Sequence, residues 1–395
     1  MKRTDFSVDW LFAACAPDTE LLPWNAQFTP VDLPHDWQIR HADDLYRDGT
    51  LFYRKYFFVT DVPGTRRMLW FGGAYMDTTV FVNGTEVGQW KYGYTSFWFD
   101  ITDALHEGQN EVFVRCNLRH PNSRWYSGAG LYRNVELWEA PDLHLMPDGL
   151  YVAAKEGDNG AWTVAVTAEV GSVTAASAGR TLTLHLTDDN GSLLGTAAIP
   201  ADAWAALPSP DGWRTGKETA IYKASHTFTL QDPALWDLDA PSFYHITAEL
   251  TGADGVTDTL TTRFGCRTIE ATPDCGLLVN HKRVLIKGVC IHHDFGCLGS
   301  AFEYSAAKRQ LEILKSMGVN SIRTGHTPPA PQFMDLADEM GILMDVESFD
   351  CWRSGKNPYD YGRFFDEWQE KDVAAWVRRD RNHPSPVSYT HLTLP

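Results

Sequence analysis

Pairs of polar residues stand at the ends of three apolar runs in the last third of the chain. The pairs are His292 with His293, Arg323 with His326, and Glu347 with Asp350. Histidine and carboxylate side chains can transfer protons, and an arginine fork can bind groups rich in oxygen. A buried arginine is costly unless an acid neutralises it. Arg323 therefore predicts a carboxylate partner, which is either Glu347 or Asp345.

Two kinds of hydrolysis can be built from these groups. Metal-assisted hydrolysis would need three ligands, taken from His292 or His293, His326 and Asp345. Glycoside hydrolysis would place two carboxylates about the scissile bond, with His, Arg and Trp side chains holding the sugar hydroxyls. Adjacent residues of a strand point to opposite faces, so only one of His292 and His293 can face a shared site. This spacing makes the metal alternative the weaker one.

Strand and helix patterns alternate around these pairs. Apolar runs over 283–293, 319–326 and 342–350 predict buried strands, and the first of them is nearly continuous, as expected of a strand covered on both faces. Helical periodicity follows each run, over 305–318, 330–341 and 366–380. Such βα units predict a parallel sheet, and the polar pairs stand at its carboxyl end. This is the end where the active sites of β/α barrels form, and the sequence holds three such units.

The chain before residue 268 is rich in β patterns. Residues 1–140 alternate in the two-residue period of strands, and Asn83-Gly84 between apolar runs predicts a hairpin. We expect a β-sandwich or a jelly-roll domain there. Residues 141–267 hold further alternating strands, with hairpin turns predicted at Asn190-Gly191 and Asp254-Gly255. Their length and pattern predict a sandwich of immunoglobulin size.

Composition narrows the class of partner. The formal net charge of -17 argues against nucleic acid and anionic membrane surfaces. Fifteen Trp residues can build large β cores or offer flat surfaces to sugar rings. Seven scattered cysteines, without a CxxC pair, fit a reducing compartment. The apolar run "WLFAACA" is short for a signal peptide, and no stretch is long enough to span a membrane, so a cytoplasmic protein is expected.

Several segments, in order, resemble family 2 of the glycoside hydrolases, which includes β-galactosidases, β-glucuronidases and β-mannosidases. The segments are "LPHDW" (33–37), "GGAYMDTTVFVNGTEVGQWKYGYTSFWFDIT" (72–102), "SRWYSGAGLYRNVEL" (123–137), "DPALWDLDAPSFYHITAEL" (232–250), "IKGVCIHHDFGCLGS" (286–300) and "NSIRTGHTPPAPQFMDLADEMGIL" (320–343). The resemblance implies a multidomain chain in which an N-terminal all-β jelly roll and an immunoglobulin-like β-sandwich precede a (β/α)8 TIM barrel. It implies a retaining hydrolase of terminal β-glycosides, and "HHDFG" and "FDCWRSGKNPYDYGRFF" look most like β-galactosidases.

The resemblance also assigns substrate-binding residues. His292 matches the family's sugar-contacting histidine after the first barrel strand, and Arg323 and His326 match the arginine and histidine of the second strand. The residue after that histidine is often Asn or Tyr in the family, whereas this chain has Thr327.

The third barrel strand resembles the family less closely. Glu347 matches, but Val346 replaces the acid that usually precedes it. Asp350 and Trp352 match residues that line the sugar pocket. The resemblance implies no metal site in this chain and no cofactor, although the whole enzyme could hold a divalent or sodium ion.

The fourth barrel strand is where the chain departs from the family. "DRNHPS" (380–385) resembles the approach to the strand that carries the acid/base glutamate, but no carboxylate follows Asp380. No catalytic residue is therefore assigned, because the nucleophile belongs to a later strand, and the chain is expected to be truncated within the barrel and inactive. Pro386 cannot donate to a central ladder. Residues 386–395 are thus predicted to be a non-native tail.

These expectations divide the chain into four ranges, namely 1–140, 141–267, 268–385 and 386–395. The two β domains are expected to fold, whereas the barrel part, with an uncovered third strand, is expected to be unstable. A β-linked oligosaccharide or glycoside is the expected ligand, most of all a β-galactoside. A β-glucuronidase, a β-mannosidase and a non-catalytic carbohydrate-binding protein remain alternatives, and the whole protein is expected to be a homo-oligomer.

Overall fold

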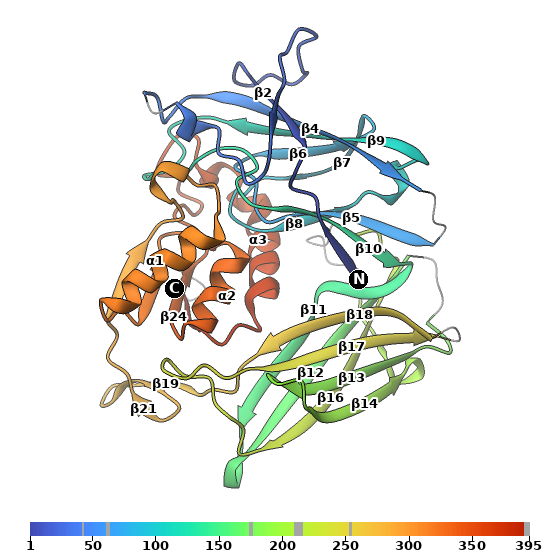
Figure 1. Ribbon diagram of the computed structural model, residues 1–395, viewed down its shortest axis with the longest axis vertical. Helices are drawn as coiled ribbons and strands as arrows, with labels where there is room; N and C mark the ends of the chain where they lie inside the picture. The colour runs from blue at the N-terminus through green and yellow to red at the C-terminus, as the bar shows by residue number, and fades with distance from the viewer. Residues whose placement is uncertain (42, 61–63, 174–176, 209–215, 253–254, 391–395) are drawn as a thin grey trace.

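The computed structural model describes residues 1–41, 43–60, 64–173, 177–208, 216–252 and 255–390. Two β-sandwiches lie at opposite ends of the molecule, and helices and a parallel sheet lie beside and between them (Figure 1). We call the β-sandwich up to residue 141 the N-terminal sandwich and the one from 143 to 264 the second sandwich.

Two sheets make up the N-terminal sandwich. The larger sheet contains, in spatial order, β3 (Thr29–Val31), β2 (Trp10–Cys15), β4 (Gly49–Val59), β9 (Gly108–Leu118), β6 (Thr78–Val82) and β7 (Thr85–Trp90). The smaller sheet contains β1 (Lys2–Asp5), β10 (Val135–Pro141), β5 (Thr65–Phe71) and β8 (Phe97–Asp100). From Asn110 onward every second residue of β9 is buried, including Val112, Val114 and Leu118, as expected of a strand with one face in the core.

The second sandwich also consists of two antiparallel sheets. One contains β11 (Leu143–Glu156), β12 (Ala161–Ser172), β16 (Ala220–Gln231) and β15 (Ala205–Ala206), and the other contains β14 (Leu193–Pro200), β13 (Thr181–Asp188), β17 (Tyr244–Gly252) and β18 (Gly255–Phe264). Leu182, Leu184 and Leu186 of β13 are fully buried in its core. The jelly-roll and immunoglobulin-like topologies of the two sandwiches stay predictions.

Strands and helices alternate in the remaining part, as predicted. A small sheet of β19 (Ile269–Thr272), β20 (Gly276–Val279) and β21 (Lys282–Arg283) precedes a parallel sheet of β22 (Gly288–Ile291), β23 (Ser321–Thr324), β24 (Leu343–Glu347) and β25 (Pro386–Thr390). The helices are α1 (Tyr304–Ser316), α2 (Pro331–Glu339) and α3 (Phe365–Asp380). Short 3-10 turns span Gln38–Arg40, Thr102–Ala104, Asp158–Gly160, Ala201–Ala203, Gly296–Leu298 and Tyr361–Arg363.

The predicted hairpin turns form where their residues are described. Val82 pairs with Thr85 across Asn83-Gly84, and both turn residues have positive φ angles. Strands β13 and β14 pair on either side of Asn190-Gly191. Asp254 lies outside the described residues, although β17 and β18 pair on either side of it.

The prediction that the run over 283–293 is buried on both faces is wrong. Arg283 ends β21, only Gly288–Ile291 joins the parallel sheet, and Leu285 and Ile286 are 71% and 52% exposed. The reason is topological, because β22 lies at an edge of the parallel sheet, where it pairs with β23 and with no other strand of the described part of the chain.

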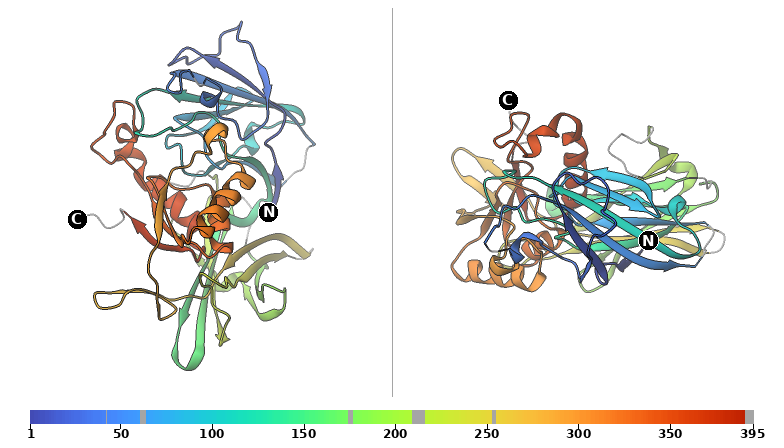
Figure 2. Two further views of the ribbon diagram at one scale, coloured as in Figure 1. Left: turned by 60° about the vertical axis from the view of Figure 1, so that its left-hand side comes forward. Right: turned by 90° about the horizontal axis from the view of Figure 1, so that it is seen from above.

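The expectation that β24 lacks a hydrogen-bonded neighbour on its second edge is also wrong. Residues 386–390, half of the predicted tail, form β25, which pairs with β24 in parallel at the outer edge of the sheet (Figure 2). Pro386 is tolerated because it is the first residue of the strand, and the ladder begins one residue earlier, where the Met344 amide donates to the Ser385 carbonyl over 2.9 Å. Residues 391–395 lie outside the described part.

Helix α3 contacts both sandwiches. Thr95 of the N-terminal sandwich donates to Asp372 over 2.8 Å. On the other side, Arg378 pairs with Glu169 of the second sandwich over 2.7 Å. Just after the helix, Asn382 accepts from the Val152 amide over 3.0 Å.

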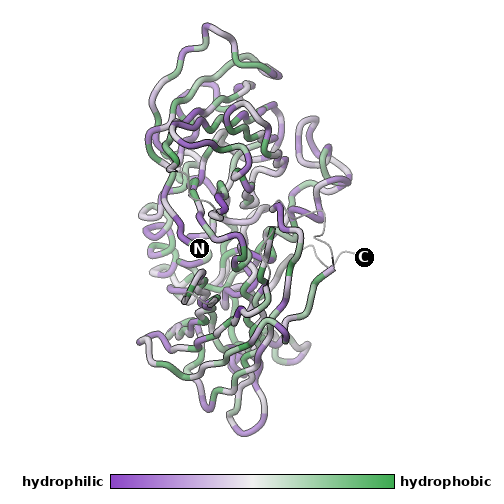
Figure 3. Tube along the Cα trace, turned by 90° about the vertical axis from the view of Figure 1, so that its right-hand side faces the viewer, coloured by the Kyte–Doolittle hydropathy of each residue, from purple (hydrophilic) through white to green (hydrophobic). Residues whose placement is uncertain are grey.

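Hydrophobic and hydrophilic residues are interleaved along the chain (Figure 3). Among the described residues, the helices are too short or too polar to cross a bilayer.

Candidate active site

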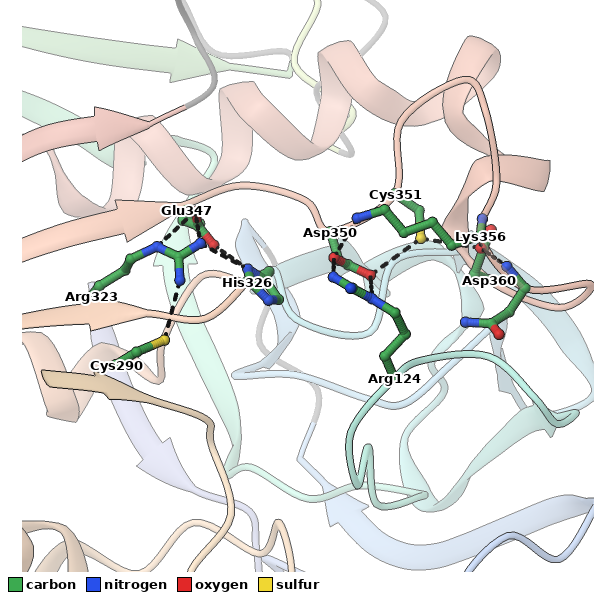
Figure 4. A network of polar contacts seen from close by, with 10 residues as sticks. Arg124, Cys290, Arg323, His326, Glu347, Asp350, Cys351, Lys356 and Asp360 are labelled. Atoms are coloured by element: carbon green, nitrogen blue, oxygen red, sulfur yellow. Dashed lines mark hydrogen bonds and ion pairs between the residues drawn. The ribbon is translucent and has the colours of Figure 1, made fainter.

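Glu347 is the centre of a charged cluster at the carboxyl end of the parallel sheet (Figure 4). Its Oε1 accepts from Nε and Nη2 of Arg323 at 3.1 and 2.6 Å. Its Oε2 lies 2.6 Å from Nδ1 of His326. The Glu347 side chain is 2% exposed. Its contacts with Arg323 and His326 therefore offset the cost of burying its negative charge. The predicted acid partner of Arg323 is therefore Glu347.

The carboxylate fixes how His326 can meet a ligand. Nδ1 is best assigned as the donor to Glu347, because the carboxylate is closer to it than Nη2 of Arg323, which lies at 3.1 Å. That assignment leaves Nε2 as the ring nitrogen available to a ligand. The arrangement suits hydrogen bonding to hydroxyl groups, since Arg323 and His326 are held in place by one buried acid.

The loop after His326 is held by two buried arginines. Nη2 of Arg133, from the N-terminal sandwich, donates to the Pro328 carbonyl over 3.1 Å. Nη2 of Arg379, from α3, donates to the Pro329 carbonyl over 2.9 Å. Both side chains thereby set the backbone that positions His326.

The adjacent histidines point in different directions. The His292 ring stacks on Trp125, with centroids 5.2 Å apart and planes 12° apart, and lies 5.9 Å from the His326 ring. His293 donates from Nε2 to the Ser127 carbonyl over 2.9 Å. Burial lowers the pKa of His293 to about 3, so its ring is neutral near pH 7. His292 therefore belongs to the cluster, and His293 supports the loop that carries Trp125.

Sequence reasoning missed two residues of this region, Arg124 and Trp125. Both come from the loop before β10, and Trp125 also contacts the His326 ring at 5.5 Å and donates from Nε1 to the Tyr94 hydroxyl over 3.2 Å. An Arg-Trp pair between Pro121 and Gly128 was the available signal, but sequence spacing alone does not place a loop against a strand some 170 residues away.

A second charged cluster surrounds Asp350, on the segment that follows β24 (Figure 4). Arg124 pairs with Asp350 at 2.5 Å, and Lys356 pairs with the same carboxylate at 2.7 Å. Burial raises the pKa of Asp350, but the hydrogen bonds and charges of Arg124 and Lys356 outweigh it, and the net pKa is lowered. Asp350 is therefore ionised near pH 7.

The Trp352 ring lies among aromatic side chains. It packs against Phe349 and Phe365, both at 5.5 Å between centroids. The role of Trp352 in a sugar pocket stays a prediction.

The described residues give the metal alternative no ligand set. Within residues 1–390, apart from the gaps named above, no three His, Cys, Asp or Glu side chains gather as metal ligands. Near the cluster, Arg323 instead donates from Nη1 to the Cys290 thiol over 3.3 Å.

Two protein-family models match the chain. Residues 271–390 match the model described as the TIM barrel domain of glycosyl hydrolases family 2, and residues 148–267 match a second model of the same family. The first match includes residues 386–390, which form β25.

Individual proteins agree with the family models. A β-galactosidase of Bacteroides ovatus is 35% identical over 97% of this chain and 45% of its own length. A β-glucuronidase of Bacteroides fragilis is 26% identical over 92% of this chain and 54% of its own length. The solved structure of a family 2 glycosyl hydrolase from Bacteroides cellulosilyticus superposes with a TM-score of 0.86 at 29% identity, and the match covers 98% of this chain and 51% of that one. The chain thus spans about half the length of the relatives it matches.

Proposed function

Because the chain belongs to family 2 of the glycosyl hydrolases, we propose that it supplies the sugar-binding half of a retaining glycosidase that hydrolyses terminal β-galactosides. The observation that supports this proposal is the Glu347 cluster. Arg323 and His326 are held by one buried carboxylate, at the sheet end where β/α enzymes bind their substrates.

Each part of the cluster suits a sugar ring. The Arg323 fork and the free nitrogen of His326 can hold hydroxyl groups, which need directional donors and acceptors. Trp125, stacked on His292, brings an aromatic surface next to them. Glu347 is occupied by two partners, so its proposed task is to orient Arg323 and His326 and not to attack the sugar.

The catalytic pair of carboxylates would come from elsewhere in the barrel. Retaining glycosidases use two carboxyl groups about 5–5.5 Å apart, one as nucleophile and one as acid/base. No carboxylate follows Asp380 in this sequence, and Glu347 is committed to its ion pairs. We therefore propose that the 395-residue chain binds but does not hydrolyse its substrate.

A direct test compares two proteins with nitrophenyl β-D-galactoside and β-D-glucuronide. One is the 395-residue chain, and the other is a chimera in which the residues after Ser385 come from the matching part of the Bacteroides ovatus β-galactosidase. We expect no hydrolysis by the chain and hydrolysis of the galactoside by the chimera. In the chimera, Arg323→Ala or His326→Ala should lower kcat/KM at least about tenfold, the effect of losing one charged hydrogen bond.

Three results would contradict the proposal. Hydrolysis by the chain alone, at the rate of a whole enzyme, would show that its own carboxylates suffice. A chimera active only on the glucuronide would assign the other sugar. If the chimera does not fold, titration of the 395-residue chain with methyl β-D-galactoside still tests binding, and a chain that binds no galactoside refutes the assignment.

A further inference from the structure

We propose that Arg124 and Lys356 form an anion-binding site beside the sugar site, and that it accepts a carboxylate or sulfate group carried by the substrate. The inference rests on the proposed function, because the anionic group would belong to a glycan bound at the Glu347 cluster. It narrows the proposed substrate from β-galactosides in general to those whose sugar carries an acidic group.

The two cations cover a buried acid. Arg124 and Lys356 both pair with Oδ1 of Asp350, at 2.5 and 2.7 Å. Their side chains are 52% and 43% exposed, whereas that of Asp350 is 5% exposed. The negative charge therefore lies beneath, and the face that a ligand would meet is positive.

Both cations keep donors for a ligand. A guanidinium has five N–H groups and an ammonium has three. Asp350 takes hydrogen bonds from Nε and Nη2 of Arg124 and from Nζ of Lys356. The remaining N–H groups of two half-exposed side chains can hold a second anion without breaking these contacts, since bidentate and charge-assisted bonds suit oxyanions.

Asp360, the neighbouring acid, does not occupy the exposed donors of Arg124 and Lys356. Asp360 is 2% exposed, and its carboxylate accepts from the backbone amides of Lys356 and Asn357, each at 2.6 Å, and from that of Gly362 at 2.9 Å. The Cys351 thiol donates to it over 3.1 Å. Asp360 is thus enclosed by its own loop and shapes the segment that carries Lys356.

The basic pair adjoins the sugar site. Trp125, the residue after Arg124, contacts the rings of His292 and His326, and Asp350 is three residues after Glu347. Trp125 and Asp350 line one small cavity. A substituent on a sugar held at His326 therefore comes close to the two cations (Figure 4).

The charge of the whole chain makes such a local site necessary for an acidic substrate. At a net charge of -17, the protein repels anions on average, and capture of one requires cations placed where it binds. Arg124 comes from the N-terminal sandwich and Lys356 from the segment after β24, so the two parts of the molecule together would select the charge.

The test titrates the 395-residue chain with three ligands that differ in one substituent, at low ionic strength and neutral pH. They are methyl β-D-galactoside, methyl β-D-galacturonide and methyl β-D-galactoside 6-sulfate. We expect at least one acidic ligand to bind about three- to thirtyfold more tightly than the neutral one, which is the range for two exposed ion pairs, and salt to reduce the preference. The acidic ligand that is preferred identifies the substituent.

Matched variants separate the basic pair from general charge. Arg124→Gln and Lys356→Gln should each remove most of the preference. Arg353→Gln removes the same charge from the same loop, at a side chain that is 78% exposed and paired with Asp366, and should leave the preference unchanged. If a variant is unfolded by circular dichroism, the salt dependence of the preference in the unaltered chain carries the test.

The outcomes distinguish this inference from the proposed function. Equal affinity for all three ligands, or a preference that survives both substitutions or high salt, overturns the anion site while leaving the galactoside site intact. A chain that binds none of the three ligands overturns both.

Discussion

Trp125 of the N-terminal sandwich lies flat on His292 of the parallel-sheet region, with ring centroids 5.2 Å and ring planes 12° apart. The stack joins two parts of the chain at the site where we expect the sugar to bind. We therefore expect the N-terminal sandwich to form part of the proposed binding site.

Replacing Trp125 by Ala should weaken binding of methyl β-D-galactoside about two- to tenfold, the value of one aromatic contact. The free energy of unfolding should fall by roughly 1–3 kcal/mol, because the ring is partly buried and also bonded to Tyr94. Calorimetric titration and urea denaturation measure the two effects. Trp24→Ala is the matched control, since that ring is 97% exposed, and it should change neither quantity appreciably.

Glu347→Gln should lower the free energy of unfolding by roughly 1–3 kcal/mol, because it leaves Arg323 without the acid that neutralises it. The loss stays below that of a fully buried pair, since Arg323 is 39% exposed and water takes over part of its solvation. Urea denaturation gives the value. Glu312→Gln, at a surface pair of 3.9 Å, should stay within about 0.5 kcal/mol of the unaltered chain. Equal effects of the two variants would show that the cluster contributes nothing to stability.

Asp372 should make stability depend on pH. Burial raises the pKa of Asp372 from 3.8 to about 7, although hydroxyl donors such as Tyr361 oppose the shift. Between these values the folded chain keeps a proton that the unfolded chain releases, so the free energy of unfolding falls as the pH rises, and levels off above about 7. Relative to the unaltered chain, Asp372→Asn should gain roughly 2–4 kcal/mol between about pH 4.5 and pH 8.

Urea denaturation at several pH values measures this difference, and other titrating groups cancel because both proteins contain them. Parallel stability curves for the two proteins would show that Asp372 does not hold a proton in the folded state.

Arg133→Met should loosen the loop that carries His326. The guanidinium is buried and donates to the carbonyls of Gly72, Tyr94 and Pro328, so its loss leaves these acceptors unpaired at a cost of roughly 2–4 kcal/mol. Hydrogen exchange should speed up in residues 325–330 more than in β13, which lies in the distant second sandwich. Uniform acceleration throughout the chain would instead indicate global destabilisation.

Removal of residues 386–395 should promote aggregation. It exposes the edge of β24, and it removes Val387 from the apolar cluster that contains Trp236 and Leu343. Light scattering and size-exclusion chromatography report the effect. Removal of residues 391–395 alone keeps β25 and should leave the chain monodisperse. Identical behaviour of the two truncated chains would mean that β25 does not stabilise the sheet.

Periodicity and turn chemistry predicted the local structure well. The sequence predicted the three helices after residue 300 and the hairpins at Asn83-Gly84 and Asn190-Gly191, because each of these elements depends on residues close to one another in the chain. An acid partner for Arg323 was predictable for a different reason, since consecutive parallel strands bring their carboxyl ends together. The sequence left Glu347 and Asp345 as alternatives, and the structure selects Glu347.

Contacts between segments far apart in the chain could not be predicted from the sequence. Arg124 and Trp125 reach the site from another part of the chain, and no spacing rule connects them to His292 or Asp350. The apolar composition of the run wrongly predicted that Leu285 and Ile286 are buried, because composition does not reveal that the strand lies at the edge of a sheet. Pro386 wrongly predicted that no strand forms after Ser385, because a proline is tolerated as the first residue of a strand. The oligomeric state and the cytoplasmic location stay predictions.

The bonds of α3 and the residues that follow it have a consequence for how the molecule unfolds. Asp372 binds Thr95 of one sandwich, and Arg378 and Asn382 bind the other. Melting of this one helix would remove contacts from both sandwiches at once. The chain is therefore expected to denature as a single cooperative unit. The ranges predicted from its sequence would then not unfold independently of one another.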